Sequence, residues 1–304
     1  MTDPEPGPTS APPAAAQPRA RSRLACYVSL TRLDKPIGIA LLLWPTLDAL
    51  WIAARGWPGA RLAAIFCLGT VLMRSAGCAI NDVADRRFDA HVERTAGRVL
   101  ARGEIASSEA IAVAVVLAAC AALTLPLLAP ATFPLALAAV LIAVSYPYCK
   151  RFFPLPQAYL GIAFSFGIPM AFAAVLGHVP VAGWLLLLAN LFWVVAYDTE
   201  YAMVDRRDDM RIGIRSSAIL FGQADVLAVA SCYAIYLGML AALARSQGLG
   251  WCFALGWTAA LASAIVHLGW IRDRDPQQCF RAFRHNHWLG LSIFAGIVGD
   301  YAWR

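Results

Sequence analysis

The chain has 304 residues, of which 60% are hydrophobic and only 14% are charged, and its formal net charge is +6. Soluble domains carry roughly a quarter charged residues, and apolar runs of about 18 or more residues, the length of a membrane-spanning helix, recur along this chain. The composition therefore excludes a pair of soluble domains and predicts an all-α polytopic membrane protein. The basic residues lie in loops between apolar runs, which argues against a nucleic-acid-binding face.

The first 22 residues differ from the rest of the chain. They are rich in Pro, Ala, Ser and Gln and cannot bury a core. The segment lacks the apolar centre of a secretory signal, and Asp3 and Glu5 argue against a transit peptide. We expect residues 1–22 to be a disordered tail and residues 23–304 to form one intramembrane domain.

Nine apolar segments follow in chain order, and Pro and Gly mark several of the connections between them. Each segment is long enough to span a membrane as a helix. The predicted spans are 36–54, 61–82, 108–128, 131–148, 157–176, 180–203, 222–244, 249–271 and 285–303.

The basic residues give the orientation. Of the 25 Lys and Arg residues, 20 fall in segments on the side of the N-terminus and four on the opposite side, with Arg74 inside the second span. Because cytoplasmic segments carry the excess of Lys and Arg, we expect the N-terminus and the loops after the second and sixth spans to be cytoplasmic.

Eight cysteines are scattered along the chain without a Cys-x-x-Cys pair. Five of them lie inside apolar runs, where a thiol behaves as a small hydrophobe. The spacing predicts neither a zinc site nor a disulfide framework, and we interpret all eight as reduced packing residues.

Acidic residues cluster at the ends of the second and sixth spans. The first acidic motif covers residues 81–89 and the second covers residues 198–209. Carboxylates are costly near hydrocarbon, so such clusters indicate a binding or catalytic role. Carboxylate oxygens suit Mg²⁺, which commonly bridges them to phosphate oxygens. The two motifs therefore predict a membrane enzyme that acts on a diphosphate.

Helical geometry indicates which acids act together, because successive residues are about 100° apart. One stripe of the first motif contains Asn81, Asp85 and Asp89. One stripe of the second contains Asp198, Asp205 and Asp209. The favoured Mg²⁺ ligands are Asp85, Asp89, Asp205 and Asp209, with Asp82 and Asp208 as second choices.

Two acidic rows that face each other repel strongly unless cations lie between them. A pair of Mg²⁺ ions would neutralise the rows and stabilise charge on a diphosphate leaving group. Basic side chains beside the rows can complete the site by binding phosphate. The candidates are Arg94, Lys150, Arg151 and Arg215. An alternative role for each is that of a topology-determining cytoplasmic cation.

Several stretches are specific enough to suggest a family. They include Arg32-Leu33-Asp34-Lys35-Pro36, Leu43-Trp44-Pro45-Thr46, Tyr201-Ala202-Met203-Val204-Asp205 and Ile212-Gly213-Ile214-Arg215-Ser216. With the first acidic motif, they resemble the 4-hydroxybenzoate polyprenyltransferases of the UbiA-type intramembrane prenyltransferases, over about residues 27–303. Two positions depart from the usual pattern: Val99 stands where Pro is usual, and Arg207 stands where an acid is usual.

The resemblance implies a bundle of nine transmembrane helices around a central cavity open to the cytoplasm, in the bacterial inner membrane. It implies Mg²⁺-dependent transfer of a polyprenyl chain from a polyprenyl diphosphate to the ring carbon ortho to the hydroxyl of 4-hydroxybenzoate, a step of ubiquinone biosynthesis. No nucleic acid and no obligate protein partner are expected. By motif position, the metal–diphosphate unit would be held by Asn81, Asp85, Asp89, Asp198, Asp205 and Asp209.

Three roles stay open on the sequence. Asp198 is a candidate for helping to deprotonate the phenol or the ring. Arg32 is either the cation that pairs with the benzoate carboxylate or an interfacial anchor. Arg74, inside a span, has either a structural partner or a role in the cavity, because an intramembrane charge is costly unless it is paired.

Two alternative functions also remain. A secondary transporter places charges near the membrane midplane in broken helices, whereas the acids here cluster at one membrane face. An enzyme of the same kind with a different acceptor, such as homogentisate, a naphthoate or a haem, is the second alternative.

Overall fold

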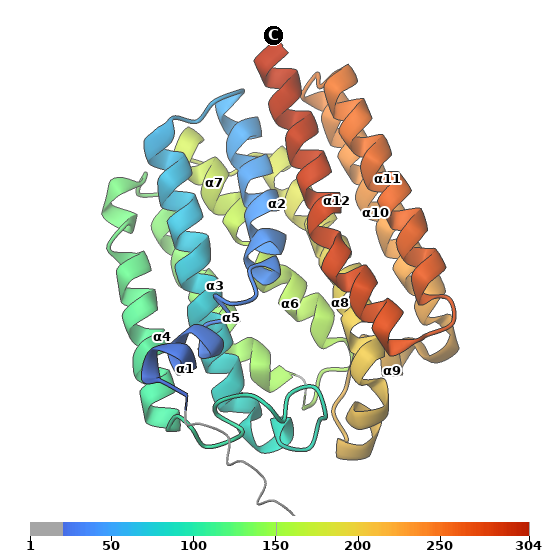
Figure 1. The fold of residues 1–304 in the computed structure, drawn as a ribbon. Helices are drawn as coiled ribbons and strands as arrows, with labels where there is room; N and C mark the ends of the chain where they lie inside the picture. Colours follow the sequence, from blue (N-terminus) through green and yellow to red (C-terminus); the bar gives the residue numbers. More distant parts are fainter. Residues whose placement is uncertain (1–20, 150, 304) are drawn as a thin grey trace, which may run out of the picture.

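The computed structural model describes residues 21–149 and 151–303, which form a bundle of helices without strands (Figure 1). The predicted disordered tail lies outside the described residues except for its last two positions. Ser22 caps the first helix by accepting a hydrogen bond from the backbone N–H of Ala25. The helices are α1 (Arg23–Leu30), α2 (Ile37–Ala54), α3 (Ala60–Asp89), α4 (Ser107–Ala122), η1 (Leu125–Leu127), α5 (Thr132–Cys149), α6 (Pro156–Ser165), α7 (Gly167–Leu176), α8 (Val181–Ile212), α9 (Ser217–Phe221), η2 (Gly222–Ala224), α10 (Asp225–Ser246), α11 (Trp251–Ile271) and α12 (Pro276–Trp303).

Eight helical segments of the described chain are long and apolar enough to cross a membrane, and they correspond to the first eight predicted spans. The ninth predicted span falls within α12, which runs beside α11 (Figure 1) but is not among the eight. Its first turns carry polar residues, among them Arg281, Arg284 and Asn286. The count of nine spans therefore stays a prediction. All eight cysteines are free, as expected from their spacing.

The two helices that carry the acidic motifs continue beyond their apolar stretches. The span predicted to end at residue 82 reaches Asp89 in α3, and the span predicted to end at residue 203 reaches Ile212 in α8. Gly213 ends α8 in the left-handed conformation, φ 74°, which glycine adopts without a steric penalty. Figure 1 shows these two helix ends at the same end of the bundle as α1 and α9.

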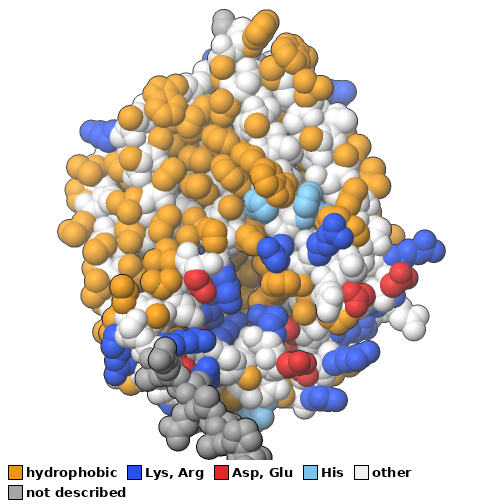
Figure 2. Space-filling model, in the orientation of Figure 1, with side chains coloured by type: hydrophobic (Ala, Val, Ile, Leu, Met, Phe, Trp, Pro, Cys, Tyr) orange, Lys and Arg blue, Asp and Glu red, His pale blue; other side chains and the backbone are white. Residues whose placement is uncertain are grey.

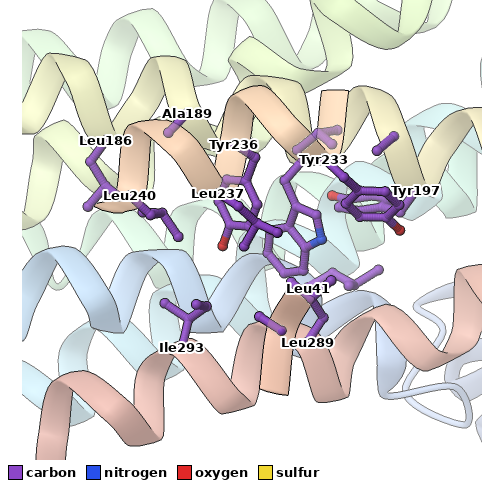
Figure 3. Packing of buried hydrophobic residues seen from close by; sticks show 14 of the residues in the cluster. Leu41, Leu186, Ala189, Tyr197, Tyr233, Tyr236, Leu237, Leu240, Leu289 and Ile293 are labelled. Atoms are coloured by element: carbon purple, nitrogen blue, oxygen red, sulfur yellow. The ribbon is translucent and has the colours of Figure 1, made fainter. Parts of the chain in front are cut away.

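The main core lies where α2, α8, α10 and α12 meet. Figure 3 shows side chains from these helices converging there. Trp193 of α8 is fully buried and stacks on Tyr236 of α10, with ring centroids 5.5 Å apart. Helices α11 and α12 approach closely because Gly256 carries no side chain, since a Cβ there would lie 2.2 Å from the carbonyl oxygen of Ser292. The stacking of Trp193 on Tyr236 packs α8 against α10.

A second, smaller core anchors the segment between α3 and α4. Val99, Leu100 and Ile105 of this segment are almost completely buried against residues of α1, α3 and α4. Val99, which departs from the usual family pattern, is therefore a packing residue here. The anchored segment, residues 90–106, carries Arg94 and Arg98 and is called the arginine loop below.

Candidate active site

A cavity of about 1170 Å³ lies between the two acidic motifs. Helices α2, α3, α5, α6, α7, α8 and α12 contribute to its wall. One part of the wall is apolar, with Leu41, Phe66 and Phe164 among its residues. The other part carries the predicted site residues Arg32, Asn81, Asp82, Asp85, Asp89, Arg94, Asp198, Asp205, Asp209 and Arg215. The structure thus brings both predicted stripes into one chamber.

The outer surface reflects the same division. Hydrophobic side chains cover most of the upper part of the face in Figure 2, and Lys, Arg, Asp and Glu gather on the lower part, near α1 and α9. The surface is hollowed between basic side chains in that lower part (Figure 2).

The first acidic motif is bound by arginines. Nη2 of Arg32 donates to both carboxylate oxygens of Asp82, at 2.9 and 2.8 Å. Nη1 of Arg98 lies 3.0 Å from the same carboxylate and donates to Asp89 at 2.7 Å. Asp82 is only 1% exposed. The best-buried carboxylate of the motif is therefore already neutralised by two guanidiniums.

The arginine loop also reaches the second motif. Nε of Arg94 donates to both oxygens of Asp205, at 2.9 and 3.1 Å, and the guanidinium lies 4.3 Å from the ring centroid of Tyr201. The backbone N–H of Glu93 donates to Asp208 at 3.2 Å. One loop thus joins the ends of α3 and α8 across the cavity.

Both loop arginines stay charged despite their surroundings. Burial opposes the charged form of each guanidinium, but nearby groups more than offset it. Asp82 and Asp89 raise the pKa of Arg98, and Tyr201 and Asp205 raise the pKa of Arg94 above the ordinary value. The loop therefore brings two permanent positive charges to an acidic chamber.

The chamber suits a hard divalent cation. Among the described residues no group of three or more His, Cys, Asp or Glu is already gathered around one metal position. The wall nevertheless presents carboxylate and amide oxygens from two helices, which are the donors Mg²⁺ takes. These oxygens belong to Asn81, Asp85, Asp89, Asp198, Asp205 and Asp209. The residues present therefore fit Mg²⁺ bound together with a phosphate group.

Two predicted substrate-binding cations, Arg215 and Arg151, have different surroundings. Arg215 lines the cavity and donates to the carbonyl oxygen of Phe152 at 2.7 Å. Arg151, in contrast, is not part of the wall: it donates to the carbonyl oxygen of Ala84 at 3.1 Å and packs on the ring of Tyr148. Its role as a phosphate-binding residue therefore stays a prediction. Lys150 lies outside the described residues.

Arg74 is the cation that the sequence left undecided, and it lines the cavity. Nη1 donates to Sγ of Cys78 at 2.6 Å, and the guanidinium lies 5.6 Å from the ring centroid of Phe164. No carboxylate of the described residues forms an ion pair with it, and its buried Nε has no hydrogen-bond partner. Gly38 leaves room for it, since a Cβ there would lie 2.8 Å from Nη2.

Arg74 shares a helix face with the first motif. It lies seven residues before Asn81 and eleven before Asp85, which places all three within about 40° on α3. The position of Arg74 inside a predicted span and its spacing from Asn81 and Asp85 were the sequence signals for a role in the cavity. Arg32, the residue first considered for the benzoate carboxylate, is instead engaged with Asp82.

The comparison with protein families decides the assignment. Residues 42–290 match the model of the UbiA prenyltransferase family. The chain belongs to this family. It is accordingly a multi-pass membrane prenyltransferase, and the transporter alternative is set aside.

Similar proteins agree with this assignment. The 4-hydroxybenzoate octaprenyltransferase of Burkholderia vietnamiensis (strain G4 / LMG 22486) is 58% identical over 280 residues, which cover 92% of this chain and 97% of that protein. The apo structure of a UbiA homolog from Aeropyrum pernix K1 has a TM-score of 0.74 at 27% identity and covers 86% of this chain and 97% of its own. A UbiA homolog from Archaeoglobus fulgidus, solved bound to GPP and Mg²⁺, has a TM-score of 0.67 at 17% identity, covers 90% of this chain and 99% of its own, and supports the fold alone.

Proposed function

We propose that this prenyltransferase moves a polyprenyl chain from a polyprenyl diphosphate to the ring carbon ortho to the hydroxyl of 4-hydroxybenzoate. The observation that carries the proposal is one cavity whose wall combines both acidic motifs, an apolar region and the guanidinium of Arg74, which pairs with no carboxylate of the described residues. The similarity to 4-hydroxybenzoate octaprenyltransferases supports this acceptor and an octaprenyl donor.

The acidic end of the cavity binds the diphosphate in this proposal. Mg²⁺ bound with the diphosphate would withdraw negative charge from it and so make it a better leaving group. The residues that would hold this unit are Asn81, Asp85, Asp89, Asp205 and Asp209. Asp82 is assigned to holding Arg32 and Arg98, because both guanidiniums contact it.

Arg94, Arg98 and Arg215 supply positive charge around the diphosphate. All three line the cavity, and a guanidinium can donate two parallel hydrogen bonds to phosphate oxygens. Arg94 is placed to exchange its contact with Asp205 for a phosphate oxygen.

Arg74 binds the carboxylate of the aromatic acceptor. It lies about 10 Å along the helix axis from Asn81, from seven residues at about 1.5 Å each. This distance leaves room for one aromatic ring between the guanidinium and the diphosphate end. The acceptor is thereby oriented with its hydroxyl side towards the allylic carbon.

The reaction breaks the allylic carbon–oxygen bond and a ring carbon–hydrogen bond, and it forms a carbon–carbon bond and a bond from the released proton to a base. The allylic carbon–oxygen bond breaks, and its electron pair leaves with the diphosphate. The ring carbon ortho to the hydroxyl bonds to the allylic carbon, and the proton on that ring carbon passes to a base. Asp198, in the cavity wall, is the base we assign.

The charge distribution supports a cytoplasmic active site in the bacterial inner membrane. Both acidic motifs lie at the end of the bundle that bears the excess of Lys and Arg (Figure 2). The diphosphate group would then enter from the cytoplasmic side, while the chain remains among apolar side chains.

A transfer assay tests the function. Membranes that contain the protein are incubated with Mg²⁺, octaprenyl diphosphate and labelled 4-hydroxybenzoate, homogentisate, a naphthoate or haem in parallel. We expect only 4-hydroxybenzoate to become lipid-soluble, and a chelator of divalent cations to stop the transfer. Labelling of another acceptor would reject the assignment, and an unchanged rate with chelator would reject the metal requirement.

A further inference from the structure

A second set of polar side chains is buried outside the cavity. Glu200, His267 and Asn286 are 0% exposed and Tyr233 is 2% exposed. They come from α8, α11, α12 and α10 respectively, and none belongs to the cavity wall. Together with Trp193 they are called the back-face network below.

The network is tightly hydrogen-bonded. Nδ2 of Asn286 donates to Oε2 of Glu200 at 2.8 Å, and the hydroxyl of Tyr233 donates to Oε1 at 2.9 Å. The same hydroxyl lies 3.0 Å from Nδ1 of His267, and Nε1 of Trp193 donates to Oδ1 of Asn286 at 2.9 Å. Glu200 thus binds α8 to both α10 and α12 through one carboxylate.

Glu200 lies inside the second acidic motif but on the opposite side of α8. It is about 140° from Asp205 and about 180° from Asp209 around the helix axis, at 100° per residue. Its two hydrogen bonds are directional, whereas apolar packing between helices in a bilayer is not. A rotation of α8 by about 20° would displace its cavity-facing carboxylates by about 2 Å.

We propose that Glu200 is a positioning residue that fixes the rotation of α8 and so aims Asp198, Asp205 and Asp209 into the cavity. The proposal rests on the proposed function, because it gives these three carboxylates their task. Misplacement of reacting groups by about 1 Å can cost on the order of a hundredfold in rate. The network thus acts on catalysis without touching the substrate.

The decisive comparison is between two substitutions of Glu200. Glu200→Leu removes both hydrogen bonds, whereas Glu200→Gln can keep them, because its amide oxygen accepts from Asn286 and its amide nitrogen donates to Tyr233. We expect Glu200→Leu to lower turnover about tenfold or more, with a raised KM for the polyprenyl diphosphate, and Glu200→Gln to restore wild-type kinetics.

Asn190→Leu is the matched control. Asn190 is also a buried residue of α8 and donates to Ser165 at 2.8 Å, but it lies outside the cavity wall and ten residues before Glu200. We expect wild-type kinetics per folded enzyme in this variant. If Glu200→Leu does not fold, Tyr233→Phe removes one of the two contacts and should change KM in the same direction.

Hydrogen–deuterium exchange gives a readout that needs no substrate. Exchange over residues 198–212 in lipid nanodiscs should rise in Glu200→Leu and return to the wild-type level in Glu200→Gln. Wild-type exchange and kinetics in Glu200→Leu would overturn the proposal, as would a Glu200→Gln variant as impaired as Glu200→Leu. If the wild-type protein does not prenylate 4-hydroxybenzoate, the proposed function fails while the exchange measurement still tests the positioning.

Discussion

The ends of α3 and α8 carry similar acidic motifs but are held in place differently. At the end of α3, Asp82 and Asp89 are held on the cavity side by arginines from outside the helix. At the end of α8, Asp205 pairs with Arg94 on the cavity side, and the helix is held from behind by the hydrogen bonds of Glu200 and by the ion pair of Arg206 with Asp225 of α10. The first motif is therefore neutralised locally, whereas the second depends on packing against the rest of the bundle.

The two helices also differ deeper in the bundle. Eleven residues before Asp85, α3 carries Arg74, and eleven residues before Asp205, α8 carries Val194. Only α3 therefore places a cation on the same face as its acids. In the proposed function, both helices bind the diphosphate and α3 alone binds the acceptor.

Removing one acid from each helix should have the largest effect. Asp85→Ala and Asp209→Ala should each lower prenyl transfer by about a hundredfold to a thousandfold, because each removes a carboxylate that would hold the Mg²⁺ needed to stabilise charge on the leaving diphosphate. The measurement is transfer of labelled acceptor per inserted protein. Full activity in either variant would contradict the assignment of that helix to diphosphate binding.

Arg74→Ala tests the difference between the helices. We expect KM for 4-hydroxybenzoate to rise about tenfold to a hundredfold while KM for the polyprenyl diphosphate stays near its wild-type value, because a charge-assisted contact to one substrate is lost. Steady-state kinetics with each substrate varied in turn measure the change. Val194→Ala is the matched control on α8, and it should leave both KM values nearly unchanged. Equal rises in both KM values for Arg74→Ala would show that Arg74 does not recognise the acceptor.

Asp82→Asn should have the smallest effect on chemistry. It removes the charge shared by Arg32 and Arg98, and we expect the free energy of unfolding to fall by about 2–3 kcal/mol, less than for fully buried pairs because both guanidiniums retain some solvent contact. Thermal melting in detergent checks the stability. The Mg²⁺ concentration for half-maximal activity should stay unchanged, and a large increase in it would show that Asp82 is a metal ligand after all.

The sequence predicted much of the architecture because its signals are local. Apolar run length located eight spans, and helical periodicity grouped Asn81, Asp85 and Asp89 onto one face. These inferences need only the geometry of a single helix. Run length alone ended these spans at residues 82 and 203, whereas the stripes required helix beyond them, and α3 and α8 do continue to Asp89 and Ile212.

Which side chains of different helices contact one another could not be predicted from the sequence in the same way. The sequence left Arg32 open between pairing with the benzoate carboxylate and anchoring at the interface, and it offered Arg151 for phosphate. The structure pairs Arg32 with Asp82 and joins Arg151 to the carbonyl oxygen of Ala84. Arg74 was left undecided because its neighbours, Gly38 and Phe164, come from other helices. Partners distant in sequence decide whether a charge is neutralised or available.

The sequence alone determined that the protein is a membrane helix bundle with two acidic stripes, because hydrophobicity and helical periodicity act within one segment. The tertiary structure alone decided which carboxylates are paired with arginines, that Arg74 lines the cavity, and that Glu200 is hydrogen-bonded to α10 and α12. The reason is that hydrogen bonds and ion pairs depend on which helices lie side by side. That arrangement is set by packing across the whole chain.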